Sequence, residues 1–262
     1  DDKHKINVNF KRNQIRVGNT STYNAQNNLP ERAQVDNNVT RSENESKSNT
    51  ANLRYDLKLD SMSDLTVNMG FMKSSRDNFS GSEADQRTLD GVLITKTTSK
   101  NDLNADQDRF NVNAMLTRRF RKERRSVTFN MNANTDQNRS KIQYFSENIF
   151  QNSGDTTLID QFKNDKLANT TYGASVTYSE PLSKRLTAAV GYAFNSSKSE
   201  TLNQSFDKDP VTGEYTVLDQ NLLNDFDYTS LKSAVNTSLN YKSSTLTVNV
   251  SNRVDFEDVK RT

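Results

Sequence analysis

The sequence predicts an all-β chain of antiparallel, up-and-down hairpins with about ten strands. Apolar residues recur at every second position in short runs, and these runs come in pairs separated by brief polar breaks. Long polar segments separate one pair from the next. Because successive side chains of a strand point to opposite faces, each run indicates a strand with one apolar face and one polar face.

Composition limits the alternatives. Only 32% of the 262 residues are hydrophobic and the mean hydropathy is −0.91, values that would suggest disorder if the apolar residues were scattered. They are instead concentrated in the alternating runs. A net charge of +2 leaves no unopposed basic face for a nucleic acid. The absence of cysteine excludes disulfides and thiolate metal sites, and no apolar run approaches the ~20 residues of a membrane helix.

In chain order, the first hairpin is predicted over residues 5–17. Ile6 and Phe10 lie on the same parity, and the parity resets after a polar turn near residue 12. The segment that follows, residues 18–50, is rich in Asn, Ser and Glu and shows no periodicity. That composition predicts a long loop.

Four further hairpins follow. The alternation is clearest over residues 172–194, where Pro181, which cannot donate a backbone hydrogen bond to a neighbouring strand, marks the break. The eight predicted strands of these hairpins lie near 51–60, 65–74, 109–120, 126–134, 170–179, 185–195, 230–241 and 245–255, with turns near 62, 122, 182 and 243. The segments 74–108, 134–170 and 195–229 are predicted to be long loops, with a small strand extension in the first and a tight turn in the last.

Short and long connections therefore alternate, which matches the plan of a transmembrane β-barrel with short periplasmic turns and long extracellular loops. The apolar parity extends over about eight residues, which covers ~20 Å at a strand tilt near 40°. The other parity is mainly Asn, Thr, Ser and Gly, a composition that suits a hydrated lumen. The alternative fold is a soluble extracellular β-sandwich that acts as a binding domain.

Two stretches carry a resemblance to a known family. The run TYSEPLSKRLTAAVGYAFN at 177–195 resembles the Tyr-x-Glu-Pro-Leu-x-Lys hairpin of a Bacteroidetes-type outer-membrane β-barrel family related to the TonB-dependent receptors. The run FNVNAMLTRRFRKERRSVTFNMNAN at 110–134 is similar to the strands that precede it there. The resemblance implies a barrel that follows a plug domain. No plug is visible in residues 1–262, so we interpret the chain as the barrel portion of a larger barrel.

The expected function is binding or uptake of a nutrient at the surface of a Gram-negative bacterium, in its outer membrane. The expected partners are outer-membrane lipid, a nutrient ligand and a surface lipoprotein, with TonB acting only through a plug. The alternative is a barrel that transports nothing and serves as a surface structural, adhesion or secretion-assembly component. We expect no enzymatic activity, no cofactor and no nucleic-acid partner. A single histidine, His4, excludes a multi-histidine metal site.

Two groups of residues are candidate binding sites. The aromatic residues of the predicted 134–170 loop are candidates for ligand contact, with packing between loops as the alternative: Tyr144, Phe145, Phe150 and Phe162. Oxygen-bearing residues at every second position resemble a weak calcium loop: Asp102, Asn104, Asp106 and Asp108. The second group lacks the central Gly and the bidentate Glu of an EF-hand, so a solvated acidic segment with no metal is the expected outcome.

Overall fold

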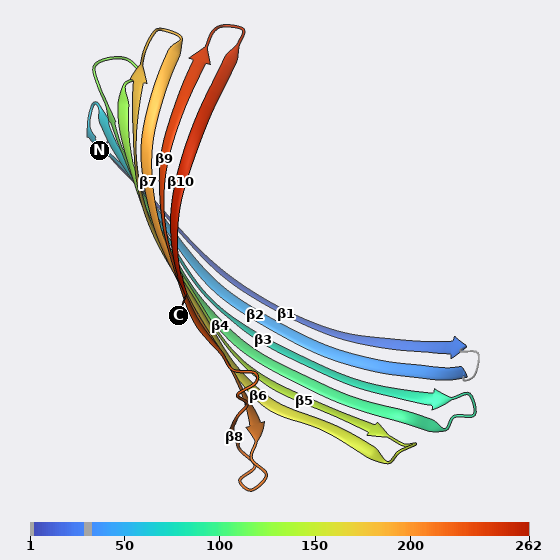
Figure 1. The fold of residues 1–262 in the computed structure, drawn as a ribbon. Coiled ribbons are helices and arrows are strands. Elements are labelled where there is room, and N and C mark those ends of the chain that lie inside the picture. The colour runs from blue at the N-terminus through green and yellow to red at the C-terminus, as the bar shows by residue number, and fades with distance from the viewer. Residues whose placement is uncertain (1–2, 29–32, 262) are drawn as a thin grey trace.

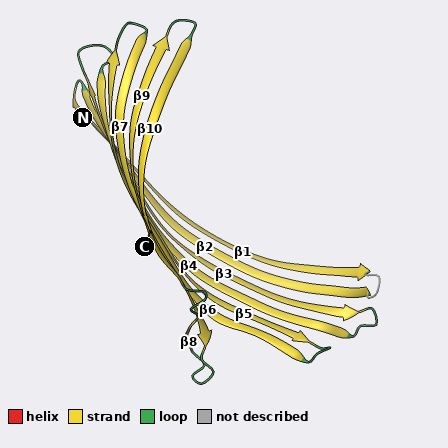
Figure 2. Cartoon of the chain, viewed as in Figure 1, coloured by secondary structure: helices red, strands yellow, loops and turns green. Residues whose placement is uncertain are grey.

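The computed structural model describes residues 3–28 and 33–261. In this part of the chain every regular element is a strand, and the strands form one long, twisted and curved sheet (Figure 1). The strands run almost from end to end of the sheet, with loops confined to strand ends (Figure 2). The bounds are β1 His4–Asn28, β2 Ala33–Asp60, β3 Ser63–Thr88, β4 Leu93–Arg119, β5 Ser126–Phe150, β6 Asp155–Pro181, β7 Leu186–Lys208, β8 Tyr215–Leu218, β9 Asn224–Lys242 and β10 Thr247–Arg261.

The sheet is antiparallel throughout, and its strands pair in sequence order. The order across the sheet is β1-β2-β3-β4-β5-β6-β7-β9-β10, and the short β8 pairs only with β7 beside this path. β1 and β10 form the two edges. The eight strands predicted from 51 to 255 agree with the observed strands to within two residues at their turn ends. The ten-stranded, up-and-down, all-β fold is therefore confirmed.

One end of the sheet carries tight turns at 61–62, 120–125, 182–185 and 243–246, and we call it the turn end. Side-chain oxygens help to close three of these turns. Asp60 accepts a hydrogen bond from the Met62 amide at 2.7 Å, Ser183 accepts from the Leu186 amide at 3.1 Å, and Ser243 accepts from the Leu246 amide at 3.0 Å. Short polar side chains of this kind stabilise turns by satisfying local backbone amides.

The predicted turn near residue 12 is wrong. β1 is continuous from His4 to Asn28, and Arg12 pairs with Asn49 in an unbroken register with β2. The reset of apolar parity at Ile15 puts that side chain on the opposite face of the same strand. The change of parity is a change of face and not a reversal of the chain.

The predicted long loops are also wrong. Residues 74–108, 134–170 and 195–229 are mainly strand, reversed by connections at 89–92, 151–154 and 209–223. Within 18–50, the described residues likewise belong to β1 and β2, and residues 29–32 lie outside the described residues. These extensions are polar on both faces, so they carry no period-two hydropathy signal. Their backbone groups are nevertheless satisfied by pairing with the strands beside them, as Ser46 shows by pairing with both Ile15 and Arg76.

This sheet has no second layer. The buried hydrophobic residues of the described chain are only Ile94 and Ala234, whereas a sandwich of this size would bury the apolar face of each sheet against the other. The β-sandwich alternative therefore does not hold. In the same part of the chain, no helix has both the length and the apolar character that would be needed to cross a bilayer.

Candidate functional site

The dominant surface feature is a continuous apolar belt near the turn end. It lies on one face of the sheet, which we call the belt face, and the opposite face is the polar face. Cross-strand pairing brings the following residues onto the belt: Ile6, Val8, Phe10, Leu53, Tyr55, Leu57, Leu65, Val67, Met69, Phe71, Phe110, Val112, Leu116, Val127, Phe129, Met131, Tyr172, Val176, Tyr178, Val190, Tyr192, Phe194, Val235, Leu239, Tyr241, Val248, Val250 and Val254. Many are open to the surroundings; Met131 at mid-belt is 66% exposed.

The size of this belt is unusual for a protein surface in water. Contiguous apolar patches on soluble monomers rarely exceed a few hundred Å², whereas this one crosses nine strands. Along each strand it spans about four alternate positions, roughly 20–25 Å at ~3.3 Å per residue. That height agrees with the ~25 Å apolar band of outer-membrane barrels.

The belt crosses the strands at an angle. A row of paired residues that starts at Val8 within the belt passes Leu53 and ends at Asp258 on β10. Asp258 lies outside the belt, which on β10 ends at Val254. A plane through the belt is therefore inclined to the rows of hydrogen bonds. Because these rows run perpendicular to the strands, the strands are tilted away from the perpendicular to that plane. Tilted strands are a geometric requirement of a closed barrel.

On the polar face, at the level of the belt, lies a row of paired residues that is rich in asparagine. Asn68 pairs with Asn113, which pairs with Asn132, and the row continues through Gly173 to Asn195. Gly173 gives the Asn132 side chain room, because a Cβ built at position 173 would lie 2.4 Å from Asn132 Oδ1. Asparagine offers donors and acceptors without net charge. This face can therefore hydrogen-bond water, a polar solute or a polar segment of protein.

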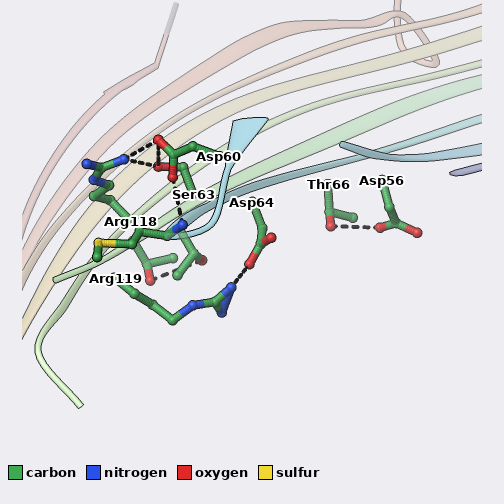
Figure 3. Close-up of polar contacts among 10 residues, drawn as sticks. Asp56, Asp60, Ser63, Asp64, Thr66, Arg118 and Arg119 are labelled. Atoms are coloured by element: carbon green, nitrogen blue, oxygen red, sulfur yellow. Dashed lines mark hydrogen bonds and ion pairs between the residues drawn. The ribbon is translucent and has the colours of Figure 1, made fainter. Parts of the chain in front are cut away.

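An ion-pair cluster fixes the turn between β2 and β3 to the end of β4 (Figure 3). Arg118 donates to Asp60 at 2.5 Å and to Ser63 at 2.5 Å, and Arg119 pairs with Asp64. The Met62 amide, followed by the Arg118 guanidinium, holds the pKa of Asp60 below its ordinary value. The sequence shows these charges only as part of a basic run, with no indication of their acidic partners.

A second cluster joins the next two turns and centres on Glu180. Arg125 makes a bidentate contact with this carboxylate at 2.7 and 2.8 Å, and Lys122 and Tyr178 each donate to it at 2.5 Å. Arg125, followed by Lys122 and Tyr178, therefore holds the pKa of Glu180 well below its ordinary value. Arg124, whose backbone is left-handed with φ 64°, donates to the Ser183 and Lys184 carbonyls at 2.7 Å each.

The four candidate aromatic residues do not lie on a loop and do not converge. Tyr144, Phe145 and Phe150 lie on β5, and Phe162 lies on β6. Tyr144 and Phe150 share the parity of the polar face, whereas Phe145 and Phe162 share that of the belt face. Tyr144 contacts Lys163, whose Nζ is 5.9 Å from the ring centroid. The structure therefore does not assemble them into a single ligand pocket.

The calcium-loop candidates are also on a strand. Asp102, Asn104, Asp106 and Asp108 lie along β4 on the belt face, beyond the belt. At ~3.3 Å per residue their side chains are spread over about 20 Å, so they cannot surround one ion. Basic residues pair beside them, as Arg139 does opposite Asp106. Within residues 3–28 and 33–261, no group of three or more His, Cys, Asp or Glu side chains is arranged to hold a metal.

The sequence analysis missed a polar cluster that attaches β8 to β6. The Tyr215 hydroxyl donates to Asp160 at 2.5 Å and accepts from Gln143 at 2.9 Å. Lys208 also donates to Asp160, at 3.1 Å, and Phe162 lies 6.1 Å from Tyr215 between ring centroids. Burial, together with the Asp160 carboxylate, raises the pKa of Tyr215. The only signal in the sequence is the turn at 209–215 that ends in this tyrosine.

Comparison with known proteins adds one match. A family model described as "Outer membrane protein beta-barrel family" matches residues 118–258, more than half of the 262-residue chain. The matched region runs from the basic end of β4 to Asp258 on β10, just beyond the belt. No curated protein matches the chain at a significant level.

Proposed function

The chain belongs to the outer membrane protein β-barrel family, and on that premise we propose that it forms part of the wall of a surface barrel. This barrel binds or takes up a nutrient, in the manner of a TonB-dependent receptor. Its location is the outer membrane. In this proposal the belt face meets lipid and the polar face lines the lumen. A plug held in that lumen would make the contact with TonB.

The observation that carries the proposal is the asparagine-rich polar face. Across β3, β4 and β5, a lumen lined by Asn68, Asn113 and Asn132 is polar and uncharged at the level of the belt, which suits a polar solute or a polar plug. On β2 the Arg54 that pairs beside Asn68 is neutralised by Asp56. The expected width of the barrel supports the same proposal. Eight strands give an interior just wide enough for side chains to fill, and this chain alone supplies nine strands to the wall.

Growth on single nutrients tests the proposal. A strain lacking the protein should fail on at least one nutrient that supports the parent, and the failure should also require TonB. Asn132→Trp fills the space beside Gly173 on the polar face and should reproduce the defect. The matched control is Lys100→Trp. Lys100 is exposed and lies on the same face of β4 as the belt but outside it, so the strain that carries this variant should grow normally. Normal growth of the Asn132→Trp strain on every nutrient would reject uptake.

The second candidate is a surface structural, adhesion or secretion-assembly barrel that transports nothing. Its supporting observation is the length of the strands: β2 has 28 residues, roughly 90 Å at ~3.3 Å per residue, so most of the sheet extends beyond the belt. In this case loss of the protein should alter surface attachment or secretion while every nutrient still supports growth, independently of TonB.

A further inference from the structure

We propose that the turns at 121–125 and 182–185, together with a hollow on the adjoining part of the belt, form a binding site for one anionic phospholipid. The phosphate would lie on the basic turns and an acyl chain in the hollow. The inference rests on the placement of the belt in a membrane. It does not depend on whether the barrel transports a nutrient.

The two turns form one basic patch. Arg124 on the first turn donates to the Ser183 and Lys184 carbonyls on the second at 2.7 Å each, so the turns lie side by side. Two carboxylates belong to this patch, Glu123 and Glu180. Six basic side chains belong to it: Arg121, Lys122, Arg124, Arg125, Lys184 and Arg185.

The positive charge of this patch is only partly neutralised. Glu180 is shared between Lys122 and Arg125. Arg121, Lys184 and Arg185 are exposed, and among the described residues none of these three side chains makes an ion pair. Basic residues at a membrane surface attract anionic lipid. The unneutralised cations therefore favour an anionic headgroup.

Directly beside the patch, the belt face is hollowed. The hollow has a volume of about 460 Å³ and is lined mainly by Tyr178, Ala188, Val190, Leu239 and Val250, with Glu180 at its edge. Ala188 pairs with Glu180 on one side and Leu239 on the other, so its methyl group leaves a gap between larger side chains. The gap connects the basic patch to the rest of the belt.

Only an amphiphile uses both features. Inorganic phosphate matches the cations but gives no role to the hollow, and an acidic protein would have to cover a surface that continues into the belt. A neutral lipid fits the hollow and leaves the cations unused. A lipid with a negatively charged headgroup satisfies both, because its charge and its acyl chain are arranged in the same order as the patch and the hollow.

The test is native mass spectrometry of the purified full-length protein, with phosphatidylglycerol or phosphatidylcholine added. The variant Arg121→Gln/Lys184→Gln/Arg185→Gln should retain phosphatidylglycerol at least about tenfold less well than the parent, since three headgroup attractions are removed. Its retention of phosphatidylcholine should not change. The control Lys96→Gln/Lys100→Gln/Lys141→Gln removes the same charge from exposed positions beyond the belt, and should behave as the parent does.

A second pair of variants tests the hollow. Ala188→Leu fills it with an apolar side chain and should also lower phosphatidylglycerol retention, whereas Ala174→Leu, on the same face outside the hollow, should not. Heat-dependent gel mobility reports whether each variant is folded. The proposal is overturned if either test variant retains the lipid as the parent does, if either control loses it equally, or if excess inorganic phosphate displaces it completely.

Discussion

Neighbouring residues on one strand meet opposite environments, and Asn130 and Met131 on β5 illustrate this. Met131 lies at mid-belt and is 66% exposed, whereas Asn130 is on the polar face and donates to Ser175 at 3.4 Å. Met131→Arg should destabilise the barrel by ~2–4 kcal/mol, because a guanidinium at the bilayer midplane loses its hydration. Asn130→Arg should cost well under half of that. Equilibrium unfolding by guanidinium chloride in lipid vesicles measures the destabilisation that each variant causes.

Spin labels at the same two positions distinguish lipid from protein. A label at 131 should be relaxed by dissolved oxygen and shielded from a polar nickel reagent, and a label at 130 should show the reverse. A label at 131 that is shielded from both reagents would contradict the exposure of the belt to lipid.

Close approach of side chains to glycine gives a second prediction at this scale. A Cβ at Gly70 would lie 2.4 Å from Asn111 Oδ1. Because this atom ends an exposed side chain that can rotate away, Gly70→Ala should destabilise the protein by only about 0.5–1.5 kcal/mol, the cost of moving Asn111 out of its rotamer. Adding Asn111→Ala should remove most of this penalty, which a double-mutant cycle measures. Gly18→Ala is the control, because its nearest neighbour is the Ser42 carbonyl at 3.9 Å. An equal loss at Gly18 would point to backbone effects instead.

At the scale of elements, Glu180 holds two turns together. Glu180→Gln should speed hydrogen exchange of the amides in the 182–185 turn, and Glu123→Gln, on the same patch, should not. The pKa of Glu180 is lowered from its ordinary value of 4.5, so its contribution is fully present above about pH 4.5 and is lost as pH falls further. Protection of the turn should therefore be constant from pH 7 to pH 5 and decrease below that. A loss already at pH 6 would contradict this assignment.

The strands of the belt could be predicted from the sequence, whereas the extensions could not. Residues 51–60 and 65–74 alternate because one face is apolar and the other is not. Residues such as Glu45 and Ser46 are both hydrophilic, so the two faces of β2 look alike there and alternation has no contrast. Pairing with β1 and β3 makes this segment a strand, and pairing partners dozens of residues away leave no local pattern.

The candidate sites were harder to predict for the same reason. Interpreting Tyr144 and Phe145 as loop residues allowed them to converge, but on a strand adjacent residues point to opposite faces. The cluster of Tyr215, Asp160 and Lys208 spans 55 residues of sequence, and nothing near any one of them indicates the others. The Glu180 hairpin and the basic turn at 120–125 could each be recognised by their residues, but the contact between them could not.

At the scale of the whole molecule, the position of the belt predicts orientation. The belt adjoins the turn end, so the turns at 61–62, 120–125, 182–185 and 243–246 should face the periplasm and the long extensions the exterior. Because the chain has no cysteine, a single introduced thiol is a unique label. On intact cells a membrane-impermeant maleimide should react with the Asp90→Cys variant and not with the Glu123→Cys variant. The opposite pattern would reverse the topology.

The strand order also sets a parity rule for closing the wall. Nine strands alternate in direction along the path from β1 to β10, so these two edge strands run the same way (Figure 1). Bacterial outer-membrane barrels are antiparallel with an even number of strands. The edges can therefore meet only through an odd number of further strands. A cysteine pair at Val8 and Val254 should not form a disulfide within one barrel, because at least one strand separates the edges that carry them.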